Sequence, residues 1–274
     1  MSEKQPLRSR PIRVVMFGSG PDLNHDAQEF LYRLVLHPEI ELAGAFFQAQ
    51  SRSLRAVMTD LWKRRGWLAL PLFAAWIITK TARFISHPRR ERALKKKLAA
   101  VANRIHFVPD IHAPQVLEQV RALAPDLGLI YGSPILKPDL FEIPAFGTLG
   151  IHHGKVPEYR GNKTTFWAMY NGEPFAGVTI QKINKGLDTG SIVKEGRVKA
   201  DLRSYASVMR DLEQLGLDLY IQAVLEVKNG TASFRPQAGA KGKLYRNPKL
   251  GDFLTFWSRQ IQRRLGGRSR LIRS

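Results

Sequence analysis

The chain has 274 residues, of which 44% are hydrophobic, with 22 glycines and 16 prolines. This size and composition fit one globular domain, or one domain with a small appendage, and exclude a disordered or fibrous protein. The absence of cysteine excludes disulfides, a thiol nucleophile and thiolate ligands for a metal.

The formal net charge of +20 comes from two segments: residues 51–104 hold 14 Lys/Arg and 2 Asp/Glu, and residues 241–274 hold 10 and 1. The body of the chain is therefore nearly neutral. The longest apolar stretch, residues 67–79, has 13 residues and contains Pro71, whereas a membrane-spanning helix needs roughly 20. The basic N-terminus is not followed by the apolar core of a signal peptide. We therefore expect a cytoplasmic protein.

Short β-rich runs alternate with helical patterns along the first 150 residues. The predicted strands cover residues 12–17, 41–47, 104–108, 127–131 and 147–152, and the predicted helices cover 22–36, 115–123 and 139–142. This alternation is typical of an α/β protein with a Rossmann-like, doubly wound, mostly parallel sheet. Ligands of such sheets bind beyond the carboxyl ends of the strands.

The second half of the chain predicts two strands, over 176–183 and 191–198, and a long helix over 205–227. Residues 51–104 break the alternation of strands and helices, and we interpret them as an inserted, Trp-rich helical segment. A basic amphipathic helix, ended by Gly266 and Gly267, is predicted for the tail. Its apolar stripe is Leu250, Phe253, Leu254, Trp257, Ile261 and Leu265, with Arg259, Arg263 and Arg264 on the opposite face.

Two features carry side chains that are able to do chemistry. His152 and His153 end a predicted strand, and Asp188 lies in a Gly-x-Asp-x-Gly turn. Taken alone, each is ordinary: the histidines fit a solvated loop, and the turn fits a β-hairpin connection. Successive residues on a strand point to opposite faces, so only one of the two histidines faces a given cleft. No metal is expected, because the nearby acidic residues have no recognised ligand spacing.

The combination of three motifs is more specific than any one of them. They are Tyr131–Leu136, then Gly147–Gly161 with its Pro-Glu-Tyr-Arg-Gly ending, then Gly186–Gly190. From about residue 127 to residue 198 the chain resembles the folate-dependent formyltransferase family, whose pattern is Asn-x-His, Pro-x-Tyr-Arg-Gly and Leu-Asp-x-Gly. The resemblance implies the formyltransferase type of sheet, with a catalytic domain over 11–230 that includes the insertion, and a basic extension over 231–274.

Carried over position by position, the resemblance implies that His152 and Asp188 are catalytic and that 10-formyltetrahydrofolate is the co-substrate. Asp188 would orient His152, which would stabilise the oxyanion and relay a proton from an amine acceptor. The cofactor-binding positions would be Tyr131, Ile135, Leu136, Leu140, Asn184, Lys185, Gly186 and Leu187. The acceptor-binding positions would be His153, Arg160, Gly161 and Asn162.

One departure from the family pattern concerns the asparagine two residues before the histidine, which is Gly150 here. In the family this amide donates to the formyl oxygen as negative charge develops. Losing such a donor typically costs about 10²–10³ in rate. Either His153 or Asn162 replaces the donor, or the acceptor differs, or the site is catalytically weak.

Two other functions stay open at this point. One is a formyltetrahydrofolate hydrolase, in which water replaces the amine and whose members share the two adjacent histidines. The other is a non-catalytic binding protein with the same fold, for which Gly150 is the best support. For the formyltransferase, an amino-sugar, a lipid-linked envelope precursor or a small amine would serve as the acceptor.

The two basic segments allow three interpretations: a solvated basic face, association with an anionic membrane surface, or nucleic-acid binding. The apolar run over 67–79 lies between cationic blocks. Contact with nucleic acid needs the charge but not the apolar residues. We therefore favour a peripheral location on the inner face of a membrane, with nucleic acid as the weaker hypothesis.

Overall fold

The computed structural model describes residues 9–20, 25–49, 98–237 and 242–271, and a few single positions between 58 and 96. Side chains are described as far as residue 263. The predicted insertion over 51–104 therefore lies largely outside the described residues. Its last part forms the short 3-10 helix η2 (Ala99–Arg104), which leads into a strand of the sheet.

The main sheet has seven strands in the order β3-β2-β1-β4-β5-β7-β8. The first five strands of this order form four parallel pairs, while β5 with β7 and β7 with β8 pair antiparallel. This architecture confirms the predicted doubly wound, mostly parallel sheet. The strands are β1 (Ile12–Ser19), β2 (Ile40–Gln48), β3 (Ile105–Val108), β4 (Leu127–Tyr131), β5 (Thr148–His152), β7 (Phe175–Lys182) and β8 (Ile192–Lys199).

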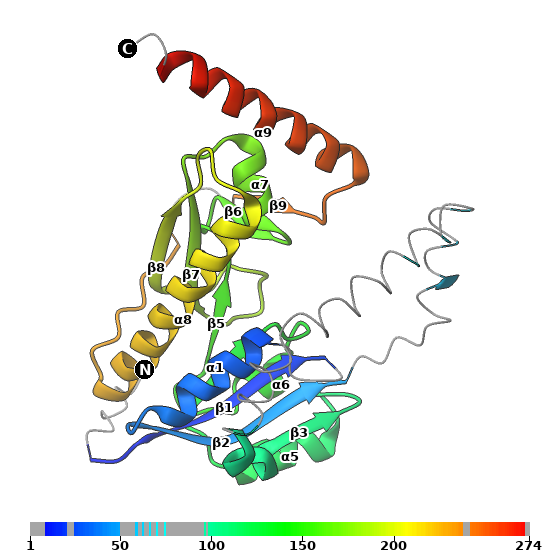
Figure 1. The fold of residues 1–274 in the computed structure, drawn as a ribbon. Helices are drawn as coiled ribbons and strands as arrows, with labels where there is room; N and C mark the ends of the chain where they lie inside the picture. Colours follow the sequence, from blue (N-terminus) through cyan, green and yellow to red (C-terminus); the bar gives the residue numbers. More distant parts are fainter. Residues whose placement is uncertain are drawn as a thin grey trace.

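Helices cover both faces of the parallel part because β1 alternates its side chains between two cores. Val14 and Met16 pack with α1 (His25–Leu36) and α8 (Tyr205–Asn229). Val15 and Phe17 pack with α5 (Pro114–Ala122) and α6 (Pro138–Phe141). Figure 1 shows α8 running along the sheet from the β1–β5 part to the β7–β8 part.

A buried tyrosine of α8 ties together the two strands that lead to the site. The Tyr220 hydroxyl accepts from the Ile130 backbone N–H at 2.9 Å and donates to the Leu149 carbonyl at 2.7 Å. Complete burial raises the pKa of this phenol, so it stays a neutral donor. The ends of β4 and β5 are thereby held in a fixed relation.

Three elements were not expected from the sequence. They are β6 (Tyr159–Gly161), α7 (Thr164–Asn171) and β9 (Lys243–Tyr245). β6 and β9 form a separate two-stranded parallel sheet. The pairing joins segments more than 80 residues apart along the chain, and no local sequence pattern predicts this pairing.

The predicted tail helix is present as α9 (Leu250–Leu271), but the prediction that Gly266 and Gly267 end it is wrong, because the helix continues through both. Phe256 is the residue of α9 that is buried against Phe166 of α7. Arg259 and Arg263 donate to the carbonyls of Tyr170 and Met169 at the carboxyl end of α7. Cations at this end of a helix are favourable.

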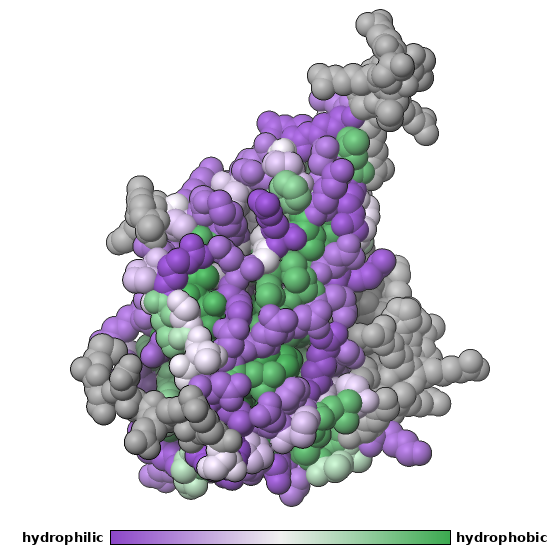
Figure 2. Space-filling model, turned by 90° about the vertical axis from the view of Figure 1, so that its left-hand side faces the viewer, coloured by the Kyte–Doolittle hydropathy of each residue, from purple (hydrophilic) through white to green (hydrophobic). Residues whose placement is uncertain are grey.

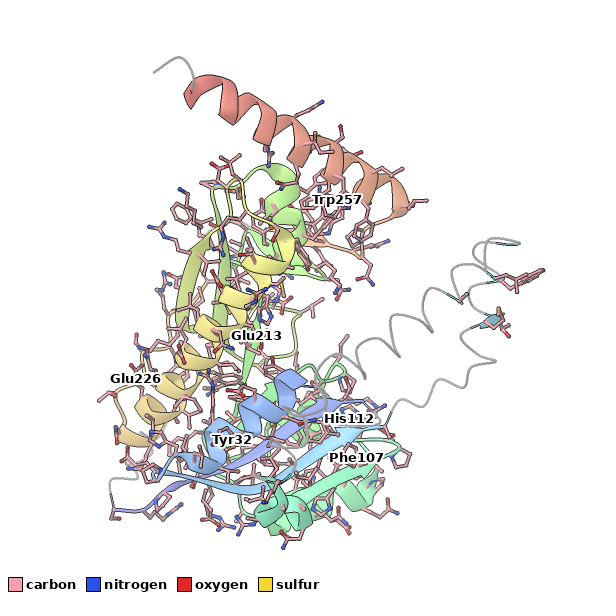
Figure 3. The ribbon with its side chains drawn as sticks, viewed as in Figure 1. Tyr32, Phe107, His112, Glu213, Glu226 and Trp257 are labelled. Carbon is pink, nitrogen blue, oxygen red and sulfur yellow. The ribbon has the colours of Figure 1, made fainter. Side chains whose placement is uncertain are left out.

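Part of the apolar stripe of α9 is exposed, whereas Phe253 contacts Phe166 of α7 and Trp257 lines a small pocket with Phe166. Figure 3 shows Trp257 on α9, near α7. The exposed members of the stripe are Leu250, Leu254, Trp257 and Ile261, at 56–64% relative exposure, and Phe253 at 42%.

Among the described residues, no helix is both long and apolar enough to cross a membrane. On the face seen in Figure 2, hydrophilic residues surround separate hydrophobic areas.

Candidate active site

The carboxyl ends of β1, β4 and β5 meet at one edge of the sheet. The strand order reverses between β1 and β4, which is where ligands bind in doubly wound sheets. Ser19, at the end of β1, donates from its hydroxyl to the carbonyl of Gly132, just after β4. His152 is the last residue of β5, so it lies at the same edge of the sheet as the loops that follow β1 and β4.

His152 is held between two acceptors. It is only 8% exposed. Its Nε2 donates to the Tyr159 carbonyl oxygen at 2.8 Å, and its Nδ1 lies 3.5 Å from Asp188 Oδ1. A Cβ on Gly154 would lie 2.4 Å from that Nε2. Glycine at position 154 is therefore needed for the ring to reach Tyr159.

Asp188 sits at the end of the loop between β7 and β8, with a positive φ of 50°. Asp is one of the few non-glycine residues that adopt this conformation readily. Its Oδ2 accepts from the Gly161 backbone N–H at 2.8 Å, and its Oδ1 accepts from Gln181 Nε2 at 3.1 Å. The Arg160 guanidinium donates to the neighbouring Leu187 carbonyl at 2.9 Å. The Pro-Glu-Tyr-Arg-Gly motif thus fixes the loop that carries the carboxylate.

The electrostatics of the pair reflect burial and charge acting in opposite directions. Burial lowers the pKa of His152 below its ordinary value, while the Asp188 carboxylate and the Tyr159 carbonyl act to raise it. At neutral pH this imidazole is therefore mainly neutral, with its single N–H on Nε2, and the unprotonated Nδ1 beside Asp188 is the atom able to accept a proton. The adjacent carboxylate then stabilises the imidazolium that forms.

Because His152 is buried in its neutral form, we expect it to make unfolding easier at acid pH. The unfolded chain takes up its proton first, at a pKa near 6.5. The stability that His152 contributes is therefore complete above this value and is lost as the pH falls towards the folded pKa. Denaturant unfolding of wild type and His152→Gln should show a difference in unfolding free energy that shrinks below about pH 6.5. A difference independent of pH would contradict the assignment.

A cleft of about 300 Å³ lies beside Asp188. This volume is at the small end for ligand pockets. One wall is apolar and includes Ile135, which is 81% exposed at the mouth, and Leu136. The opposite wall is the loop over 184–188, where Asn184 Oδ1 accepts from the Gly186 N–H and the Thr189 hydroxyl. A flat ring system with one polar edge matches this combination of walls.

Six of the eight predicted cofactor-binding residues line this cleft: Ile135, Leu136, Asn184, Lys185, Gly186 and Leu187. The other two lie elsewhere. Leu140 belongs to α6 and is completely buried in the core. The Tyr131 hydroxyl donates to Glu213 of α8. The motif alone could not distinguish a residue that supports the wall from one that forms it.

The predicted acceptor-binding residues are divided between two faces of the sheet. His153 points opposite to His152, as the alternation along β5 requires, and its Nε2 lies 2.9 Å from Glu213 Oε2. Figure 3 shows Glu213 on α8 in the middle of the molecule. Arg160 and Gly161 contact the Asp188 loop, and Asn162 is exposed, with its backbone N–H donating to the Tyr245 carbonyl. Neither His153 nor Asn162 lines the 300 Å³ cleft.

Residues after 230 also contribute to the site, which the sequence did not indicate. β9 pairs with β6, which carries Arg160 and Gly161. Gln237 Nε2 donates to the carbonyls of Asp188 and Gly190 at 3.0 and 2.8 Å. Gln181 was not predicted either, because only the register between β5 and β7 shows that it lies opposite Gly150.

A Rossmann-like sheet with a buried imidazole–carboxylate pair beside a cleft at the strand ends is the architecture of an enzyme active site. The family model described as formyl transferase matches residues 50–224. The chain belongs to this family.

Relatives and solved structures agree with this assignment. The methionyl-tRNA formyltransferase of Chloroflexus aggregans is 30% identical over 187 residues, which is 66% of this chain and 60% of that protein. A sugar N-formyltransferase from Shewanella sp FDAARGOS_354 has a TM-score of 0.57 at 13% identity, covering 89% of this chain and 86% of the other. WlaRD, a sugar 3N-formyl transferase solved in the presence of dTDP and 5-N-formyl-THF, has a TM-score of 0.52 at 14% identity, with 86% and 70% covered.

At these identities the solved structures support the fold alone. The chain spans 41–60% of the length of the curated relatives that it matches.

Proposed function

We propose that this protein transfers a formyl group from 10-formyltetrahydrofolate to the nitrogen of an amine acceptor. The observation that carries the proposal is the position of Asp188, which contacts His152 and at the same time lines the cleft of about 300 Å³. The cleft fits a pterin because a flat apolar face meets Ile135 and Leu136, while a polar edge meets the loop over 184–187. Membership of the formyl transferase family supports the same reaction.

In the proposed reaction the amine nitrogen attacks the formyl carbon, and the electrons of the C=O bond move onto its oxygen. The tetrahedral species then collapses: the bond from carbon to N10 of the folate breaks, and N10 receives the proton that the amine has lost. His152 accepts and returns this proton, and Asp188 stabilises the transient imidazolium. Burial of the pair excludes water, which would otherwise compete with the amine.

The acceptor would reach His152 from the side of Arg160, Gly161 and Asn162, whereas His153 faces Glu213 on the opposite side of β5 and would not contact it. Arg160 and Gly161 would act mainly by holding the Asp188 loop, to which both are bonded. We place amino-sugars and lipid-linked amines ahead of methionyl-tRNA as acceptors. The basic tail, treated below, suits an amine acceptor that is presented at a membrane.

A turnover assay separates the three candidate functions. Purified protein would be given 10-formyltetrahydrofolate with nucleotide-linked amino-sugars, glycinamide ribonucleotide or methionyl-tRNA, and tetrahydrofolate and formate would be measured. Amine-dependent tetrahydrofolate without formate supports the transferase. Formate without any amine identifies a hydrolase, and no product in either arm leaves only a binding protein.

We further propose that α9 docks on an anionic bilayer. Leu250, Leu254, Trp257 and Ile261 form an exposed stripe along one side of the helix, and residues 241–274 carry 10 Lys/Arg against 1 acidic residue. Tryptophan and leucine beside excess positive charge are typical of helices that lie in the interface of an anionic membrane. The charge argues against a second copy of the same basic helix as the partner, because the two would repel.

Flotation with vesicles tests this docking. We expect wild type to float with phosphatidylserine-containing vesicles and not with phosphatidylcholine alone, and the double variant Leu254→Gln/Trp257→Gln to lose binding. Leu36→Gln, which changes an equally exposed leucine on α1, should float like wild type. Absence of wild-type binding, or binding that survives in the double variant, would overturn the proposal.

A further inference from the structure

The family asparagine that donates to the formyl oxygen is absent from this chain. In this chain position 150 is glycine, and a Cβ built there would lie 2.7 Å from Cδ1 of Ile183. The Ile183 side chain therefore occupies the space into which an asparagine side chain would extend. A donor to the formyl oxygen must come from another residue on the same face of the sheet.

Gln181 is the residue directly across from Gly150 in the antiparallel pair of β5 and β7. Residues paired in this way project from the same face of a sheet, with Cβ atoms about 5 Å apart. Gln181 is 3% exposed and lines the 300 Å³ cleft together with Gly150 and Asp188. An amide is thus present on the correct face, carried by the neighbouring strand.

The orientation of this amide is fixed by its partners. Gln237 Nε2, which can only donate, lies 3.3 Å from Gln181 Oε1, and this is the longest of three contacts that its two hydrogens share. Gln181 Nε2 in turn donates to Asp188 Oδ1 at 3.1 Å. That same carboxylate oxygen is 3.5 Å from His152 Nδ1. The Gln181 nitrogen therefore lies next to the proton-transfer pair.

The amide nitrogen has two hydrogens, and within the described part of the chain Asp188 is the one acceptor that it contacts. Gln237 also donates to the carbonyls of Asp188 and Gly190, and so it links Gln181 to the loop that carries Asp188. The second N–H of Gln181 therefore has no acceptor among the described residues, and Gln181 lines the cleft. A buried, pre-oriented donor of this kind is what stabilises an oxyanion without reorganisation.

We infer that Gln181 donates to the formyl oxygen as it becomes negatively charged, in place of the asparagine replaced by Gly150, and that Gln237 is its positioning residue. The inference rests on the proposed formyl transfer. It explains how a chain without the family asparagine retains a complete site. It replaces His153, whose ring faces Glu213 on the opposite side of β5, and Asn162, which lies after β6 and is exposed, as donors.

The test compares Gln181→Met, which keeps the length of the side chain and removes the donor, with wild type and with Gln222→Met on the exposed side of α8. We expect kcat of Gln181→Met to fall by about 10²–10³. Affinity for 5-formyltetrahydrofolate and the unfolding midpoint should stay close to wild type. Gln222→Met should behave as wild type.

A rescue variant separates a lost donor from a disturbed site. In the Gln181→Met background, Gly150→Asn restores the amide on β5, and Ile183→Val removes the Cδ1 atom that would collide with it. We expect this triple variant to recover much of kcat, and Gln181→Met/Ile183→Val without the asparagine to recover none. Two results would overturn the role of Gln181 while leaving the proposed function intact. One is an active wild type with a kcat of Gln181→Met within about tenfold of the wild-type value. The other is an active wild type with no recovery of kcat in the triple variant. A wild type that neither transfers nor releases formyl groups overturns the proposed function as well.

Discussion

Replacing His152 with alanine is expected to lower kcat by about 10²–10⁴, the usual contribution of a positioned acid–base group. The imidazole is the only titratable ring in contact with Asp188 among the described residues, and burial keeps it neutral and ready to accept a proton. Because the ring does not line the 300 Å³ cleft, folate affinity should change little. The measurement is steady-state turnover together with titration of 5-formyltetrahydrofolate.

His106→Ala is the matched control for this experiment. His106 lies on β3 at the far edge of the sheet and is exposed, so its removal should leave kcat unchanged. Turnover of His152→Ala close to that of the control would remove His152 from the mechanism. A parallel loss of folate binding would instead indicate that the variant disturbs the cleft.

The second large effect is expected for Asp188→Asn. Asparagine tolerates the positive φ at this position, so the loop should keep its shape, which alanine would not guarantee. The single oxygen of the amide can still accept from the Gly161 N–H. The NH₂ group then faces Gln181 Nε2, and two donors repel each other there. The NH₂ group of the asparagine would also donate to Nδ1 of His152 and so oppose protonation of this atom. We expect kcat to fall by about 10²–10⁴.

The pKa of His152 provides an independent readout for this variant. The negative charge of Asp188 is the main influence that raises this pKa against burial, so its removal should lower the pKa further. NMR titration of the imidazole in wild type and Asp188→Asn measures the change. An unchanged or higher pKa in the variant would show that the two side chains are not coupled.

Much of the fold could be predicted because its signals are local. The strands of the parallel sheet are short β-rich runs bounded by turn residues, and their predicted limits lie within about two residues of those observed. The pairing of His152 with Asp188 depended on a combination of motifs and not on any single pattern. The cleft formed by Ile135, Leu136 and the 184–187 loop followed from the same motifs.

The remainder depends on long-range contacts that have no local signal. Gln181 and Gln237 come together only because β7 pairs with β5 in a particular register and the segment after α8 returns to β8. The amphipathic pattern of α9 predicted the helix correctly, but an apolar stripe alone does not say which side packs on the protein. Here Phe256, Phe253 and the arginines contact α7, and Leu250, Leu254 and Ile261 remain exposed.

The most direct test of the central claim is a crystal structure of the wild-type chain with 5-formyltetrahydrofolate. We expect the pterin between Ile135, Leu136 and the 184–187 loop, with the part of the folate that carries N10 directed towards His152 and Gln181. A ligand bound instead in the separate cavity of about 450 Å³ that Glu173 and Arg197 help to line, or no folate bound at saturating concentration, would contradict the account.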